Sequence, residues 1–221
     1  MTEMEQAWQS AEREPDNVGE LSGNPNDNPD GEHIEKSSDA TEQLVGEFKN
    51  QLVSLEWSIH PEDLAELKLS KRHDEDGLVE YLKRDPEGLR EEIKDLMRRF
   101  EEVCDGIRQV RHATGEAFAH FQDIYTREAS TTAGTLLEAQ AKELWHSGLA
   151  DSSEELYRMM THTDRTHQDY QRLVLMLDDG ELGSRTLVRD TRAIEEGIDK
   201  LQGAVTGFKG ALSYAYKNPP M

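Results

Sequence analysis

The sequence predicts an all-α protein, an elongated helical bundle or coiled coil that follows a disordered acidic N-terminal arm. Three observations support this fold class. Apolar residues recur at alternating spacings of four and three over long stretches, which is typical of amphipathic helices and heptad repeats. Prolines followed by acidic residues mark helix starts, and no apolar-polar alternation is long enough to predict a strand. We therefore expect an arm over 1–38, a helical bundle over 39–217 and a flexible tail over 218–221.

The predicted arm is strongly acidic. The first forty residues hold eleven acidic and two basic side chains, with three prolines among Asn, Asp, Gly and Ser. This composition cannot bury enough apolar surface to fold alone. Met4, Ala7 and Trp8 stand at helical spacing and are the predicted partner-binding residues, because such a segment can fold on a partner. A tryptophan exposed in a flexible tail is the alternative.

The first helix is expected to begin at Asp39, which forms a capping pair with Glu42. Pro61 and Pro86, each followed by glutamate, mark two further helix starts, and the segment around Leu78 is a short helix between them. The stripe of the first helix consists of Leu44, Phe48, Leu52, Leu55 and Ile59.

The helix from Pro86 is predicted to run for about forty residues, or about 60 Å at 1.5 Å per residue. Another helical region opens near Thr131, breaks at His146-Ser147-Gly148, and restarts at a capping box of Ser152 and Glu155. The turn at 177–184 then precedes the last helix. On that helix one flank would allow close approach of a neighbour, at Gly197, Ala204 and Ala211, and the outer face carries Gly203, Gly207 and Gly210.

The apolar stripes are wider than the two-position seam of a dimeric coiled coil. This width indicates a bundle of three or more helices, which we expect a second copy of the chain to complete. The residues predicted to mediate oligomerisation are Leu89, Ile93, Leu96, Phe100, Val103, Ile107, Val110, Phe121, Ile124, Leu187, Ile194, Ile198, Leu201, Val205, Phe208 and Leu212.

Charge and composition exclude several classes of protein. The chain has 46 acidic and 25 basic residues, a net charge of −21, so direct binding to nucleic acid or to an anionic membrane is not expected. The longest apolar run, Leu173 to Leu177, is too short to span a membrane, and the acidic N-terminus lacks the features of a signal peptide. Cys104 is the single cysteine, which fits a reducing compartment. A cytoplasmic protein is predicted, or one inside a host cell if it is viral.

Glu143 and His146 have the spacing of a di-iron ligand pair, but a second such motif is missing from the sequence. A helix end at the surface is the simpler interpretation. Glu116 lies four residues from both His112 and His120, a spacing that suits zinc but is also that of an ordinary surface ion pair.

His162, Asp164 and His167 could form an acid/base or ligand trio. On a helix, however, the two imidazoles would point about 140° apart, and His167 falls on the apolar stripe. His167 is therefore predicted to be a partly buried polar residue of the seam. Cys104 also lies beside the seam, where it acts as a small hydrophobe.

These features favour a non-enzymatic, self-associating scaffold or adaptor without a cofactor. Its arm would bind a basic or nucleic-acid-binding partner protein, and its layout is that of a viral phosphoprotein-like polymerase cofactor or an assembly scaffold. A secretion-associated or cell-division accessory protein would show the same pattern. The alternative from another class is a metal-dependent enzyme that uses Glu143 and His146, with Glu116 or His120. Ser37 or Ser38 could accept a phosphate or serve in helix capping.

Overall fold

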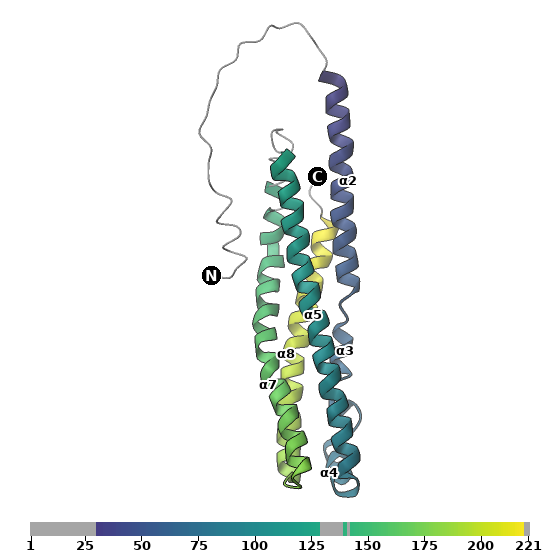
Figure 1. The fold of residues 1–221 in the computed structure, drawn as a ribbon, viewed down its shortest axis with the longest axis vertical. Helices are drawn as coiled ribbons and strands as arrows, with labels where there is room; N and C mark the ends of the chain where they lie inside the picture. Colours follow the sequence, from purple (N-terminus) through teal and green to yellow (C-terminus); the bar gives the residue numbers. More distant parts are fainter. Residues whose placement is uncertain (1–29, 129–138, 141, 219–221) are drawn as a thin grey trace. The chain divides into compact units, whose positions relative to one another are not determined.

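The computed structural model describes residues 30–128, 139–140 and 142–218 (Figure 1). The chain divides into two compact units, Met1–Ser38 and Asp39–Met221. Within the described ranges every regular element is helical, so the predicted all-α class is confirmed. Residues 1–29, which include Met4, Ala7 and Trp8, lie outside the described residues.

Helix α2 spans Asp30–Trp57 and begins before Asp39, so the predicted start at the Asp39–Glu42 capping pair is wrong. Residues 30–38, assigned from sequence to the disordered arm, are helical. The reason lies in local composition: Pro29 is the last proline before Pro61, and the intervening Glu, Lys, Ala and Gln residues are good helix formers. Acidic residues at Asp30 and Glu32 also suit the first turn of a helix.

Three short elements follow α2. They are α3 (Pro61–Ala65), the 3-10 helix η1 (Leu69–Lys71) and α4 (Glu75–Arg84). The predicted start at Pro61 is confirmed, and Asp74 caps α4 by accepting a 2.7 Å hydrogen bond from the Gly77 amide. These elements let the chain turn repeatedly while keeping Leu64, Leu69 and Leu78 buried.

Helix α5 spans Pro86–Glu128 and begins at the proline predicted to start it. Its 43 residues correspond to about 65 Å. Asp85 accepts a 2.9 Å hydrogen bond from the Gly88 amide and so satisfies one donor of the first turn.

The predicted break near Gly148 takes another form. Trp145–Leu149 is a π-helical turn, η2, which leads directly into α7 (Ala150–Asp178). Ser152 and Glu155 therefore lie inside a helical run, and the capping box predicted there is wrong. Gly148 has φ of +116°, and a wide π turn with glycine at this position absorbs the irregularity without ending the helix.

Helix α8 spans Ser184–Lys217 and packs antiparallel to α7 (Figure 1). Its flank approaches α7 closely, as predicted: a Cβ built on Gly197 would lie 2.3 Å from Thr166 Oγ1. Gly203, Gly207 and Gly210 are exposed, also as predicted.

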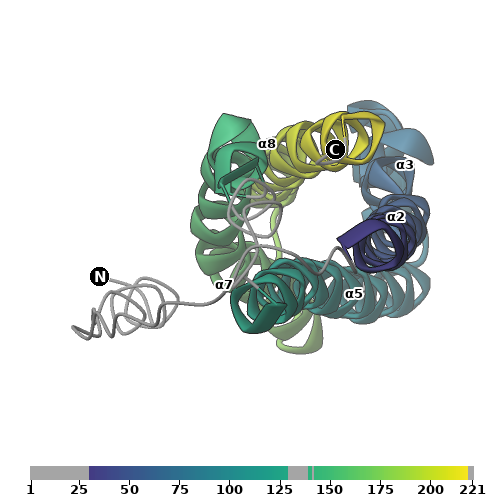
Figure 2. The same ribbon diagram turned by 90° about the horizontal axis from the view of Figure 1, so that it is seen from above.

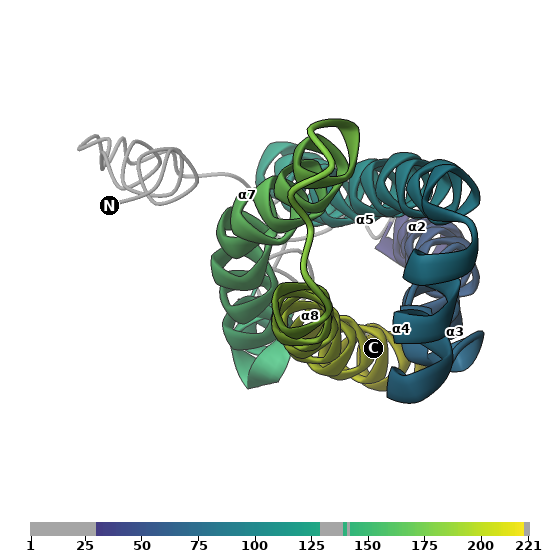
Figure 3. The same ribbon diagram turned by 90° about the horizontal axis from the view of Figure 1, so that it is seen from below.

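In the second unit, α5, α7 and α8 form three columns, and residues 39–57 of α2 with α3 and α4 form the fourth (Figures 2 and 3). Neighbouring columns contact one another: α7 lies against both α5 and α8, and α3 and α4 lie against α5 and α8. The Phe48 ring of α2 stacks on Phe121 of α5 at a centroid distance of 4.2 Å. Tyr170 donates a 3.0 Å hydrogen bond to the Leu67 carbonyl and so joins α7 to the fourth column.

The stripes that were predicted to mediate oligomerisation line the core between these columns. All of those residues except Val103 and Ile124 are buried in the single chain. Val103 is half-buried, and the side chain of Ile124 lies outside the described residues. The column that we expected a second copy to supply comes from 39–84 of the same chain, so the apolar seam needs no second copy. Self-association itself stays a prediction, and it would have to use other residues.

Candidate functional site

Two neighbouring grooves follow α8 and are the main candidate for a functional surface. The first lies between α4 and α8, has a volume of about 610 Å³, and is here called the arginine groove. The second lies between α7 and α8 and has a volume of about 550 Å³. The residues that line the arginine groove are Val79, Ser184, Arg185, Val188, Arg189, Arg192, Ala193 and Glu196.

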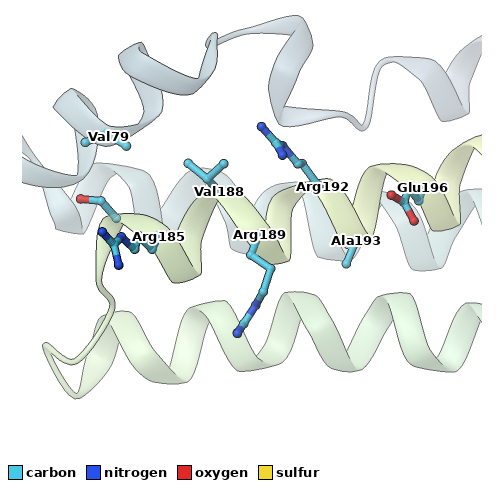
Figure 4. Close-up of a pocket in the computed structure, with 8 residues that line it drawn as sticks. Val79, Arg185, Val188, Arg189, Arg192, Ala193 and Glu196 are labelled. Carbon is cyan, nitrogen blue, oxygen red and sulfur yellow. The ribbon is translucent and has the colours of Figure 1, made fainter.

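Helical periodicity places the arginines there. The buried stripe of α8 includes Leu187, Thr191 and Ile194, whereas Arg185, Arg189 and Arg192 recur at spacings of four and three on the opposite face. In Figure 4, Val188 and Arg192 point to the side of α8 on which Val79 of α4 lies, and Arg189 points to the other side.

Each arginine of this groove has a different electrostatic environment. Arg192 binds Glu75 of α4, with Nε 2.7 Å from Oε1. Arg189 donates a 2.8 Å hydrogen bond to Asp190, which raises the pKa of its guanidinium above the ordinary value. Arg185 is exposed and has no carboxylate partner among the described residues.

Asp190 is a buried carboxylate that links α7 to α8 beneath the grooves. It is 1% exposed, and its carboxylate accepts a 3.0 Å hydrogen bond from Arg172 Nε of α7 in addition to the bond from Arg189. Because two guanidinium groups satisfy its hydrogen bonds, this carboxylate can join α7 to α8 without leaving an unpaired charge buried in the protein.

The groove between α7 and α8 continues this cationic surface. It shares Ala193 and Glu196 with the arginine groove and adds Arg165 and Lys200, which have no ion-pair partner within the described part of the chain. The cationic side chains of the two grooves are Arg158, Arg165, Arg185, Arg189, Arg192 and Lys200, against two carboxylates, Asp169 and Glu196. Carboxylates outside the lining, Glu155, Asp190 and Glu75, pair with Arg158, Arg189 and Arg192. On a chain of net charge −21, three groove cations therefore have no ion-pair partner among the described residues: Arg165, Arg185 and Lys200.

A smaller groove lies between α2 and α5 and brings together Leu55, Glu116 and His120. Glu116 Oε1 is 3.3 Å from His112 Nε2, and both side chains are exposed, in agreement with the surface ion pair that the sequence favoured. His120 lines the groove but joins no cluster of three metal-ligating side chains in the ranges that the structure describes.

The structure does not bring the other candidate residues together. Glu143 is exposed, and the His146 side chain lies outside the described residues, so their pairing stays untested. His162 is exposed in the α7–α8 groove, whereas His167 faces α5. His167 is 22% exposed at its side chain, as expected for a seam residue, and its Nδ1 lies 3.1 Å from Glu101 Oε1 without hydrogen-bond alignment.

Cys104 is 2% exposed, and burial raises the pKa of its thiol to about 12. The thiol therefore stays protonated near neutral pH and behaves as a small apolar side chain, as predicted. Ser37 and Ser38 lie within α2, and their side chains are outside the described set.

The arginine groove was missed from the sequence, although a signal was present. Three arginines spaced by four and three opposite the apolar stripe form an outward-facing cationic row, and the rest of the chain is acidic. The contribution of Val79 had no such signal, because it depends on how α4 packs against α8.

Comparisons with known proteins found no family model, curated protein or solved structure that matches the chain. No helix within the described ranges combines the length and apolar character required to cross a bilayer.

Proposed function

We propose that this chain is a non-enzymatic scaffold or adaptor protein of the cytoplasm, or of a host cell interior, that binds other proteins through its surface. The observation that carries the proposal is the use of the apolar stripes within the chain. The apolar stripes of α5, α7 and α8 are buried against one another and against the fourth column. The surfaces that remain exposed are therefore long helical faces with open grooves between them. Such faces suit the docking of protein segments.

The proposal includes two kinds of partner, a basic protein and other copies of the chain. The acidic segment over the first forty residues would attract a basic or nucleic-acid-binding protein, which is the partner predicted from sequence. Copies of the chain would associate through exposed residues instead of the buried seam. Trp57, 71% exposed, and Tyr214, 54% exposed, are two such candidates, and tryptophan and tyrosine often carry binding energy at interfaces.

The proposal is tested with the full chain and a chain that lacks residues 1–29, a truncation that leaves α2 intact. Each is used as bait under identical salt conditions, and its mass is measured by light scattering. We expect the full chain to retain a basic partner that the truncated chain loses, and both to be oligomeric. A strictly monomeric mass would refute self-association, and equal capture by both baits would refute the role of the acidic segment.

A further inference from the structure

Arg185 is an exposed cation at one end of the arginine groove, and no described residue provides it with a carboxylate partner, in a protein that is otherwise rich in carboxylates. We propose that the arginine groove binds an acidic amphipathic helix of a partner protein. This inference rests on the proposed function in taking the chain as a binding protein, and it adds a second, oppositely charged docking site to the one expected for the acidic N-terminal segment.

The local charge of the groove favours an acidic ligand. Asp190 and Glu75 bind Arg189 and Arg192, so Arg185 is the cation of the arginine groove that lacks a carboxylate partner among the described residues. The adjoining α7–α8 groove contributes Arg165 and Lys200, which also have no ion-pair partner in the described ranges, and the two grooves share the carboxylate of Glu196. At physiological ionic strength, charges more than about 8 Å away are largely screened. A short acidic segment seated in the groove is therefore attracted by these nearby cations more than it is repelled by the distant acidic surface.

The groove already holds one carboxylate. Glu75 of α4 accepts a 2.7 Å hydrogen bond from Arg192 Nε, Arg192 Nη2 lies 2.5 Å from the same oxygen, and both side chains are exposed. This pair shows that the guanidinium can be reached by a carboxylate from the α4 side. Glu75 would therefore compete with a ligand carboxylate for Arg192.

The shape of the groove suits a helix. Arg185 and Arg192 are seven residues apart, or about 10 Å along the axis of α8, which matches carboxylates two turns apart on an antiparallel helix. Val188 lies between Arg185 and Arg192 along α8, and Val79 lies across from it on α4, so the two valines offer an apolar surface for the opposite edge of the ligand (Figure 4). Charged ends and an apolar middle are the features that an amphipathic acidic helix complements.

Nucleic acid is the other polyanion that arginines recognise. It is disfavoured because a phosphate backbone has no apolar edge to place on Val79 and Val188. Such a backbone also extends beyond the groove into the acidic remainder of the surface, where each added phosphate is repelled.

The test uses fluorescence anisotropy with a synthetic amphipathic peptide of about 15 residues, or four helical turns, with leucines on one face and glutamates at spacings of four and seven. A peptide with glutamine in place of glutamate and a short single-stranded RNA are the comparison probes. The protein variants, all in the full chain, are Arg185→Glu, the matched control Lys49→Glu on α2, and Glu75→Gln. Lys49 is likewise exposed and has no ion-pair partner among the described residues.

We expect the acidic peptide to bind more tightly than the glutamine peptide, and Arg185→Glu to weaken its binding by about tenfold or more, since a charge-assisted hydrogen bond is lost and a like charge is introduced. Lys49→Glu should leave the affinity within about twofold, because Lys49 lies on α2 and lines neither groove. Glu75→Gln should tighten binding severalfold by releasing Arg192, a gain that a purely structural role of the pair would not produce. Helix content measured by circular dichroism should be unchanged in each, because a glutamate in the first turn of α8 suits the helix dipole.

Equal effects of Arg185→Glu and Lys49→Glu would overturn the proposal, as would indifference to Glu75→Gln or preferential binding of the RNA. The outcome is separable from that of the proposed function. If the acidic peptide does not bind but the full chain still captures a basic partner, only the groove proposal is refuted. If the peptide binds the groove but the chain neither captures a basic partner nor self-associates, only the broader scaffold proposal is refuted.

Discussion

The close approach of α7 and α8 at Gly197 makes a prediction that can be worked from the coordinates. A Cβ at this position would lie 2.3 Å from Thr166 Oγ1, 3.5 Å from its Cβ and 3.6 Å from its Cγ2. Ordinary contact begins near 3.4 Å, so Gly197→Ala requires Thr166 or the whole of α7 to retreat by about 1 Å. Rotation of the threonine gives limited relief, because a side chain branched at Cβ has few favoured χ1 rotamers in a helix.

Two terms of opposite sign set the size of the effect. Alanine in a helix interior is more favourable than glycine by about 1 kcal/mol. Overpacking of a filled contact costs about 1–3 kcal/mol. Gly197→Ala should therefore lower the free energy of unfolding by up to about 2 kcal/mol, whereas Gly203→Ala, where a Cβ would meet nothing within 4 Å, should raise it by up to about 1 kcal/mol.

The assay is urea denaturation followed by circular dichroism, together with thermal melting, in which 1 kcal/mol corresponds to about 2–4 °C for a chain of this size. Thr166→Ala combined with Gly197→Ala should recover most of the loss relative to Thr166→Ala alone, since the clashing atoms are gone. If Gly197→Ala stabilises the protein as much as Gly203→Ala does, or if Thr166→Ala fails to remove the penalty, the reasoning about this contact is refuted.

Three further predictions concern the core. Ile198→Ala should lower the free energy of unfolding by about 2–5 kcal/mol. Because the seam is internal to the chain, the melting temperature should fall equally at low and high protein concentration. A loss of stability confined to dilute samples would instead indicate a seam shared between copies. Tyr170→Phe should lower the free energy of unfolding by about 1–3 kcal/mol, because the Leu67 carbonyl loses its buried donor, and urea titrations that match the wild type would contradict this. The Cys104 pKa is raised on folding from 9.0 to about 12, so the stabilisation linked to the protonated thiol is complete below pH 9 and is lost as the pH rises from about 9 to 12. Between those values the stability of the wild type should fall more steeply with pH than that of Cys104→Ala, and parallel pH profiles would argue against a buried, protonated thiol.

Much of the fold could be predicted from local pattern. The long stripe from Leu89 and the starts at Pro61 and Pro86 depend on residues close in sequence, where spacing and capping chemistry act directly. The errors also have local causes. The capping pair at Asp39 was too weak a signal to end the preceding helical stretch, and the glycine at 148 was accommodated by a π turn where a helix end was expected.

The candidate site was only half visible from sequence. The arginine row on α8 follows from spacing, but its pairing does not: Glu75 reaches Arg192 from more than a hundred residues away, and Asp190 receives Arg172 from the neighbouring helix. Which arginine remains without a carboxylate is decided by these distant partners.

The sequence by itself determined that the chain is helical, where α3, α5 and α8 start, and which face of each long helix is apolar, because helix formation and amphipathicity depend on neighbours within a few turns. Only the tertiary structure decided what covers the apolar faces. The stripes that predicted a second subunit are covered by one another and by 39–84 of the same chain, since three short elements and the end of α2 together supply a fourth column. The periodicity of apolar residues indicates which face of a helix must be buried, but it does not indicate whether the helix that covers that face belongs to the same chain or to another copy.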